Sequence, residues 1–188
     1  MLEKLPSAIG RTLRRVRPGL DRIVARRQQL GRPTIDLESP AFFDHKNMPP
    51  LYTADGEGIS PPLMWAGVPD GTRSLALIVE DADSPTPLPL VHAIVLHLPP
   101  ILTELEAGAI ADGEHSPLLG RNSYMKKGWL PPDPPPGHGA HRYAFQLFAL
   151  DRDLEPAAHP GRSAFARGLD GHVLAYGLLI GSYSREPF

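Results

Sequence analysis

The 188-residue sequence contains no cysteine and no apolar run long enough to cross a membrane as a helix. The absence of cysteine excludes disulfide bonds, thiolate catalysis and zinc sites that use cysteine ligands. The N-terminal region also lacks the continuous apolar segment of a secretory signal. Because neither a membrane span nor an export signal is indicated, we expect a cytoplasmic protein.

Proline and glycine are abundant, with 23 and 18 residues, and they are spaced between short apolar runs rather than clustered. Such spacing is typical of short strands joined by rigid turns. A chain of this length fits one domain and can bury roughly 70% of its unfolded surface. The sequence therefore predicts a mainly β domain, which we place at residues 34–188, with an N-terminal appendage.

The appendage, residues 1–33, is basic, whereas the rest of the chain is acidic. It has nine lysines and arginines against two acidic residues, a net charge of +7, which leaves −9 for residues 34–188. Its apolar residues recur at steps of mostly three or four, as on one face of an amphipathic helix, and Pro18-Gly19 either kinks this helix or begins a second one. We call residues 1–33 the arm. The apolar stripe of the arm comprises Leu2, Leu5, Ile9, Leu13, Val16, Leu20, Ile23 and Leu30.

Three kinds of surface can bury this stripe: protein, an anionic membrane or nucleic acid. The stripe is narrow and aliphatic, without the tryptophan or phenylalanine typical of a lipid interface, which favours protein. An isolated helix of this length is marginally stable in water, and the charge of the arm is opposite to that of the domain. We therefore expect the arm to pack on protein, most simply across a homodimer, with a membrane surface as the rival and no binding to nucleic acid.

Acidic residues and a histidine come together at the ends of two predicted strands. Residues 74–81 form an apolar and β-branched run that ends in acids, as expected of a central strand with carboxylates at its edge. The next predicted strand, residues 91–98, has His92 near its start, after the loop that follows Asp81. We expect Asp81 and His92 to meet across adjacent strands; the alternative is that His92 is a capped histidine of the core.

Residues 131–151 present two further histidines. Five of the first ten residues of this stretch are proline and two are glycine, which indicates a stiff loop. The loop places His138 and His141 before a predicted buried strand that begins at Arg142. Taken singly, either histidine can be structural, His141 as a strand cap and His138 in solvent. Arg142 points away from His141 along the strand, toward a carboxylate such as Asp83, so we expect it to be structural.

Five segments follow one another in a distinctive order: YTADGEGISPPLMW, SLALIVEDADSP, VHAIVLHLPP, GRNSYMKKGWLPPDPPPGHGAHRYAFQLFALD and LLIGSYSR. Their order, spacing and rare residue combinations resemble those of the phosphatidylethanolamine-binding proteins, in their bacterial Raf-kinase-inhibitor-like branch. The resemblance covers about residues 35–185. It implies a mainly β fold with a large central antiparallel sheet, a smaller flanking sheet, a few short helices and a small anion-binding pocket at one end.

The resemblance also implies which residues bind the ligand. It assigns the pocket to Asp81, His92, Pro135, His141 and Tyr143, and places Asp83 and His138 at supporting positions. The sequence departs from the family pattern at three points. DADSP replaces DPDAP, Ala93 replaces the usual aromatic residue after His92, and Asp133 stands in an approach to the proline loop that is usually glycine-rich. The last two departures bear on which ligand is preferred.

A cluster of Asp81, His92 and His141 suits the binding of an anion. A carboxylate beside one or two imidazoles raises their pKa and keeps at least one of them protonated, so that the cluster donates hydrogen bonds to phosphate or carboxylate oxygens. We therefore expect a non-catalytic protein that binds a small anion, a phospholipid head group or a phosphorylated group without a cofactor. Such a protein can act as a regulator, for example as a kinase or protease inhibitor.

Two other functions use the same residues. Asp81 and His92 can serve as the general acid and base of a hydrolase for esters or phosphoesters. No serine lies in a nucleophile-elbow pattern, so this reaction needs water as its nucleophile. Asp81, His92, His138 and His141 are also residue types that bind zinc, although we expect no metal site.

Overall fold

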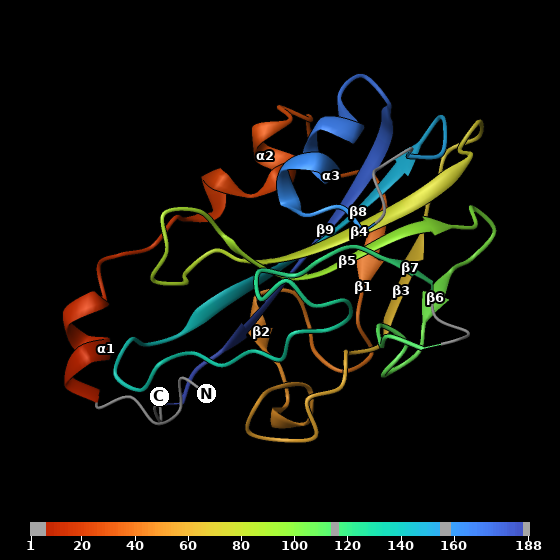
Figure 1. The fold of residues 1–188 in the computed structure, drawn as a ribbon. Helices are drawn as coiled ribbons and strands as arrows, with labels where there is room; N and C mark the ends of the chain where they lie inside the picture. The colour runs from red at the N-terminus through yellow and green to blue at the C-terminus, as the bar shows by residue number, and fades with distance from the viewer. Residues whose placement is uncertain (1–6, 114–116, 155–158, 186–188) are drawn as a thin grey trace.

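The computed structural model describes residues 7–113, 117–154 and 159–185, which form two β sheets with a few short helices (Figure 1). This confirms the predicted mainly β fold, with a large sheet beside a small one. In spatial order, the large sheet consists of β2 (Lys46–Asn47), β9 (Val173–Tyr183), β8 (His141–Leu150), β4 (Ser74–Asp81), β5 (Leu90–Leu98) and β7 (Leu118–Leu119). The small sheet consists of β1 (Asp36–Glu38), β3 (Leu63–Ala66) and β6 (Glu104–Leu105).

The pairings are antiparallel except that of β2 with β9, which is parallel. The helices are α1 (Ser7–Leu13), α2 (Val24–Arg27) and α3 (Arg162–Leu169), with single 3-10 turns at η2 (Leu20–Arg22) and η3 (Pro50–Tyr52). Within the described ranges, no helix has the length and apolar character needed to cross a membrane.

The central strands are buried because a different layer covers each face of the large sheet. Along β4, Leu75 and Leu77 belong to a core shared with the small sheet, whereas Ala76 and Ile78 belong to a core shared with α2 and α3. Figure 1 shows α2 and α3 close together on one side of the large sheet. A strand covered on both faces is apolar throughout, which is why the continuous run at residues 74–81 predicted β4 with its observed bounds.

The arm is helical in short pieces on both sides of Pro18 rather than along the whole apolar stripe. α1 ends at Leu13, well before that proline, and Gly19 has a φ of 86°, outside the helical region. The N–H of Gly19 donates to the carbonyl of Ala82 in the domain at 2.8 Å. The helix is shorter than the periodicity indicated because hydrogen bonds to the domain replace some of those that a continuous helix would make.

The second half of the arm is buried on the domain of the same chain. Ile23, Val24 and Ala25 are at most 1% exposed. The N–H of Val24 donates to the carboxylate of Glu80 at 2.7 Å, and the N–H of Ala25 donates to the side-chain carbonyl of Gln146 at 2.8 Å. This part of the apolar stripe is therefore covered without a second copy of the protein.

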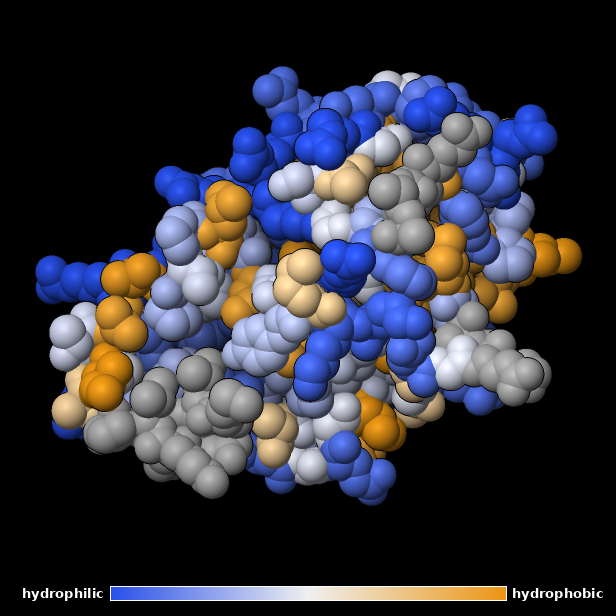
Figure 2. All heavy atoms as spheres, viewed as in Figure 1, coloured by the Kyte–Doolittle hydropathy of each residue, from blue (hydrophilic) through white to orange (hydrophobic). Residues whose placement is uncertain are grey.

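The first half of the arm leaves apolar side chains in contact with solvent. Ile9 and Val16 are 43% and 44% exposed. On the face seen in Figure 2, hydrophobic groups occur over α1, among hydrophilic ones. Leu2 and Leu5 of the stripe lie outside the described residues. Homodimerisation through the arm stays a prediction.

Candidate functional site

The predicted site residues gather at one end of the large sheet. β4 and β8 are antiparallel, so the end of β4 lies beside the beginning of β8, and Asp81 is paired with Tyr143. β5 begins on the other side of β4, where Leu90 is paired with Asp81. The end of one strand and the beginnings of its two neighbours therefore bring Asp81, His141 and His92 together.

A pocket of about 180 Å³ opens at this end of the sheet. Four of the five residues to which ligand binding was assigned, Asp81, His92, Pro135 and His141, line this pocket, whereas Tyr143 does not. The remaining wall is mostly apolar and comes largely from proline-containing loops. It consists of Ala54, Ser84, Pro85, Leu90, Tyr124, Leu130, Pro131 and Asp133.

Three buried side chains form a hydrogen-bonded series that runs from the pocket wall to the arm. Oδ2 of Asp81 lies 2.8 Å from Nδ1 of His141, and Nε2 of His141 lies 2.7 Å from Nδ1 of His138. Nε2 of His138 donates to the main-chain carbonyl of Leu13 at 2.9 Å. We call Asp81, His141 and His138 the Asp-His-His triplet. His138 does not line the pocket and is linked to it through its hydrogen bond with His141.

His92 faces the same pocket as Asp81, but no hydrogen bond joins the two among the contacts of the described residues. The register between β4 and β5 shifts after Val79, and His92 falls at this irregularity without a paired residue. Nδ1 of His92 lies 2.5 Å from the carbonyl oxygen of Leu130, which can only accept, so Nδ1 carries the hydrogen. Nε2 of His92 is buried and has no hydrogen-bond partner in the described part of the chain.

Burial lowers the pKa of His92, and this effect outweighs the carboxylate of Asp81, which raises it. Burial also lowers the pKa of His138, and the charge of His141 adds to the effect. The carboxylate was expected to keep at least one imidazole of the cluster protonated, and burial opposes this at His92. In its neutral form, His92 offers the pocket a lone pair at Nε2.

Tyr143 lies behind the pocket wall. Its ring meets that of His92 edge-on, with centroids 5.1 Å apart, and is stacked on that of His141 with centroids 6.4 Å apart. Burial, and then the charge of Asp81, raises the pKa of Tyr143 well above its usual value. The hydroxyl has no hydrogen-bond partner among the described residues. In this structure Tyr143 supports the two imidazoles by packing.

Asp83 holds Arg142, as predicted, and does not line the pocket. Its two carboxylate oxygens accept hydrogen bonds from Nη2 and Nε of Arg142 at 2.8 and 2.7 Å, and Arg17 of the arm lies 3.2 Å away. Burial alone would raise the pKa of Asp83, but the hydrogen bonds and charge of Arg142 hold it below its usual value. The N–H of Asp83 also donates to Oδ1 of Asp81, which fixes the turn after β4.

Arg185 is a residue of the site that the sequence reasoning missed. Its guanidinium lies 2.6 Å from the carboxylate of Asp133 on the pocket wall and 2.8 Å from that of Asp55. Asp55 also accepts a hydrogen bond from the hydroxyl of Tyr183 at 2.7 Å. In the sequence, Asp133 stands out only as a departure from the family pattern. The sequence does not show which distant lysine or arginine forms an ion pair with it.

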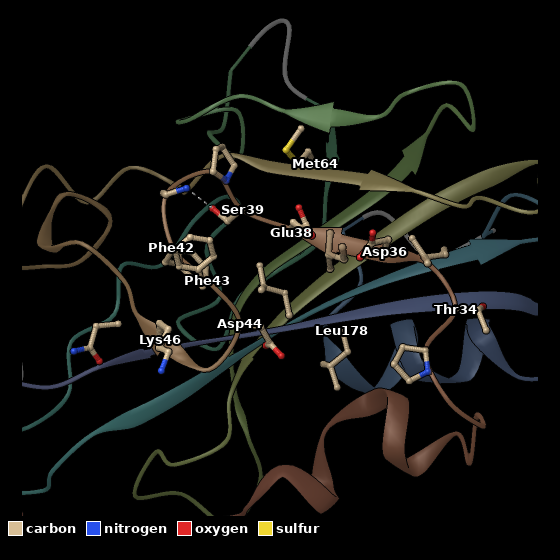
Figure 3. A pocket seen from close by; sticks show the side chains of 17 residues that line it. Thr34, Asp36, Glu38, Ser39, Phe42, Phe43, Asp44, Lys46, Met64 and Leu178 are labelled. Carbon is tan, nitrogen blue, oxygen red and sulfur yellow. Dashed lines mark hydrogen bonds between the residues drawn. The ribbon is translucent and has the colours of Figure 1, made fainter.

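A larger groove, of about 990 Å³, lies between β1 and β9 (Figure 3). Phe43 in its lining is 83% exposed, and the acidic side chains of Asp36, Glu38 and Asp44 are exposed as well. No histidine and no buried carboxylate is among its lining residues. We therefore place the candidate site in the smaller pocket, which has both.

The described residues include no group of three or more histidine, aspartate or glutamate side chains arranged to hold a metal ion. The ring nitrogens of His138 and His141 are all engaged within the Asp-His-His triplet and with Leu13. Nδ1 of His92 is bonded to a carbonyl. Of the ring nitrogens of these three histidines, only Nε2 of His92 is left to meet a ligand.

Comparison with known proteins gives consistent results. The sequence profile of a family described as phosphatidylethanolamine-binding protein matches residues 38–184. A UPF0098 protein of Methanothermobacter thermautotrophicus is 42% identical over 158 residues, which cover 80% of this chain and 99% of that protein. A UPF0098 protein of Chlamydia trachomatis is 35% identical over 156 residues, which cover 81% of this chain and all of that protein. The relatives thus include both archaeal and bacterial proteins.

Two solved structures share the fold. A phosphatidylethanolamine-binding protein homologue from Chlamydia trachomatis has a TM-score of 0.74 and 33% identity, and the match covers 82% of this chain and all of that one. The Escherichia coli protein YbcL has a TM-score of 0.75 and 24% identity, and the match covers 81% of this chain and 99% of that one. Because the family profile begins at residue 38, the arm lies outside the matched segment.

Proposed function

The chain belongs to the phosphatidylethanolamine-binding protein family, and from this premise we propose that it binds a small anionic group, phosphoryl or carboxylate, without catalysing a reaction. The proposed site is the pocket at the end of the large sheet. The observation that carries the proposal is Nε2 of His92, a buried polar atom on the pocket wall without a partner among the described residues. An unbonded buried polar group costs about 1–3 kcal/mol, and a ligand that bonds it recovers that energy.

The ligand and His92 must share one proton to form this bond. Nδ1 of His92 donates to Leu130, so the neutral ring presents only a lone pair at Nε2. An anion that still carries a hydroxyl group, such as hydrogen phosphate, can donate to this lone pair. A fully ionised anion binds there only if His92 takes up a proton. Both routes place a proton between ligand and ring, so affinity should fall as pH rises.

The rest of the wall supports the binding of a small group. Pro85, Pro131 and Pro135 have fixed φ angles, so the wall is preformed and little conformational entropy is lost when a ligand enters. A volume of about 180 Å³ suits a head group or a phosphorylated side chain rather than a whole lipid. A protein that holds such a group without converting it can act as a regulator, for example of a kinase or a protease.

The geometry does not favour the alternative, hydrolysis of an ester or phosphoester. That reaction requires Asp81 and His92 to act as an acid and base pair, but Oδ2 of Asp81 is bonded to His141. Nε2 of His141, which could otherwise take a proton from water, is bonded to His138. These contacts support binding rather than turnover.

Calorimetric titration with phosphate, acetate and phosphoethanolamine tests the proposal. We expect at least one of these ligands to bind the wild-type protein and the His92→Ala variant to bind it at least about tenfold more weakly. His172→Ala is the matched control, because the His172 side chain is 30% exposed, bonds to Asp151 and does not line the pocket. Equal affinities of the wild type and His92→Ala would show that the pocket is wrongly assigned.

A further inference from the structure

α1 lies with its backbone against the loop that carries His138 (Figure 1). A Cβ atom added to Gly10 would come within 2.0 Å of the carbonyl oxygen of Pro136. A Cβ atom added to Gly137 would come within 2.3 Å of the carbonyl oxygen of Ser7. Glycine on both surfaces therefore permits an approach that any larger residue would prevent.

This approach brings the carboxyl end of α1 to the Asp-His-His triplet. The last carbonyls of a helix have no partner inside the helix, and that of Leu13 accepts the hydrogen bond from Nε2 of His138. Arg17 follows in the arm and donates to the carbonyls of His138 and Ala140, the latter at 2.7 Å. The arm therefore holds both the ring and the main chain of His138.

The docked arm fixes the number of protons in the triplet. The carbonyl of Leu13 can only accept, so Nε2 of His138 carries a hydrogen. The bond between the two imidazoles needs a second hydrogen, and the bond between His141 and Asp81 needs a third. Two neutral imidazoles carry only two. With Asp81 ionised, the complete set of bonds therefore requires one imidazole to be protonated, and the triplet is neutral overall.

Without the arm, two protons are sufficient. His138 can then adopt its other tautomer and donate through Nδ1 to Nε2 of His141, while Nδ1 of His141 still donates to Asp81. Both remaining hydrogen bonds are made, both imidazoles are neutral, and the triplet carries the charge of Asp81. Asp81 and His141 line the pocket, so this difference of one negative charge lies in the pocket wall.

We infer that docking of the arm draws a third proton into the Asp-His-His triplet, removes a negative charge from the pocket wall, and so strengthens the binding of anions in the pocket. This inference rests on the proposed function and adds a regulatory contact to it. The arm lies outside the segment matched by the family profile, whereas the triplet lies within it.

The charged groups around the triplet are paired with one another. Asp83 is bonded to Arg142 and Arg17, and Asp133 is paired with Arg185, so the proton exchanged between about pH 5 and 8 belongs to an imidazole. Burial, and then the charge of His141, lowers the pKa of His138. The groups that face the triplet are Arg14 and Arg17 from the arm, Asp83 from the turn after β4, Arg142 and Tyr143 from β8, His92 from β5, and Asp133 with Arg185 across the pocket.

The variant Gly10→Ala tests the inference without changing a charge. Its Cβ displaces α1 from the loop, and because alanine favours a helix over glycine, the helix itself is not weakened. Gly31→Ala is the matched control, since a Cβ added there has nothing within 4 Å. Phosphate is titrated by calorimetry near pH 6.5 in two buffers of different ionisation enthalpy, which gives both the affinity and the number of protons taken up.

We expect Gly10→Ala to bind phosphate about five- to tenfold more weakly than the wild type, as befits one added negative charge near the ligand. We also expect it to take up more protons on binding, by up to about one, because the third proton is no longer in place beforehand. Gly31→Ala should match the wild type in both quantities. A purely structural role of the arm would not change the proton uptake.

A second pair of variants tests the same inference in case Gly10→Ala does not fold. Arg17→Ala removes the contacts that hold His138, and Arg15→Ala removes the same charge from an exposed position of the arm. Only Arg17→Ala should raise the proton uptake. If Gly10→Ala and Arg17→Ala take up as many protons as the wild type and bind as tightly, the inference is wrong while the pocket assignment stands. If phosphate, acetate and phosphoethanolamine all fail to bind the wild type, the pocket assignment and the inference are both wrong.

Discussion

Asp83 and Arg142 are joined by two parallel hydrogen bonds, from Nη2 to Oδ1 at 2.8 Å and from Nε to Oδ2 at 2.7 Å. The carboxylate is 1% exposed, whereas the arginine side chain is 42% exposed. We expect Arg142→Ala to lower the free energy of unfolding by about 1–2 kcal/mol, less than for a fully buried pair because solvent screens the arginine. Anion affinity should stay nearly unchanged, because neither residue lines the pocket.

The pH dependence of this effect has a definite sign. The folded-state pKa of Asp83 is lowered, so the stability that the pair contributes is present above the unfolded pKa of about 4 and is lost as pH falls further. Denaturant titrations of wild type and Arg142→Ala should therefore converge in acid. Arg152→Ala, at an exposed position, is the control. If Arg142→Ala kept wild-type stability but lost anion binding, Arg142 would be a binding residue rather than a structural one.

His92 should make stability depend on pH in the neutral range. Its folded-state pKa is lowered by burial, so the unfolded chain binds the proton more readily. The contribution of His92 is therefore full above the unfolded pKa of about 6.5 and is lost as pH falls below it. We expect the Tm to rise between pH 5 and pH 7, with a smaller rise in His92→Gln. The same slope in both proteins would show that His92 is not the group that titrates.

The two halves of the arm should differ in their effect on stability. Ile23 is 0% exposed, and Ile23→Ala should lower the free energy of unfolding by about 2–4 kcal/mol. Ile9 is 43% exposed, and Ile9→Ala should change it by less than about 1 kcal/mol. Urea denaturation measures both. Equal losses from the two substitutions would contradict the observed packing of the arm.

Homodimerisation is a separate prediction. Ile9 and Val16 are the large exposed apolar residues of the described arm, and a second copy would cover them. Light scattering should give a dimer for the wild type and a monomer for a variant with Ile9→Ser and Val16→Ser, with weaker association of the wild type at high salt. A monomeric wild type that binds anionic vesicles, where the variant does not, would replace the dimer by the membrane surface.

The sequence predicted the centre of the fold well because the signals there are local. The apolar run at residues 74–81 is bounded by turns. Such a continuous apolar run is enough to identify a strand that is covered on both faces. The arm was predicted less well, since periodicity does not reveal that Gly19 bonds to Ala82 rather than continuing a helix. Its exposed and buried apolar residues follow the same spacing, and only the tertiary contacts separate Ile9 from Ile23.

The sequence predicted which residues lie near one another at this end of the sheet, but it did not predict their hydrogen bonds. Asp81, His92 and His141 do line one pocket. The sequence could not show that an irregularity in the β4–β5 pairing turns His92 toward Leu130, or that burial outweighs the carboxylate of Asp81. The pairing of Asp133 with Arg185 likewise depends on how distant segments meet in the fold.

The central claim is that an anion in the pocket bonds Nε2 of His92, and the most direct test is a ¹⁵N NMR spectrum of the histidine rings at pH 6.5, recorded with increasing phosphate. We expect the Nε2 resonance of His92 to move from the position of an unprotonated nitrogen toward that of a protonated or strongly hydrogen-bonded one, while Nδ1, bonded to Leu130, stays protonated throughout. The ring resonances of His172, which does not line the pocket, should not change. If phosphate binds to saturation and the Nε2 resonance of His92 does not move, the claim is contradicted.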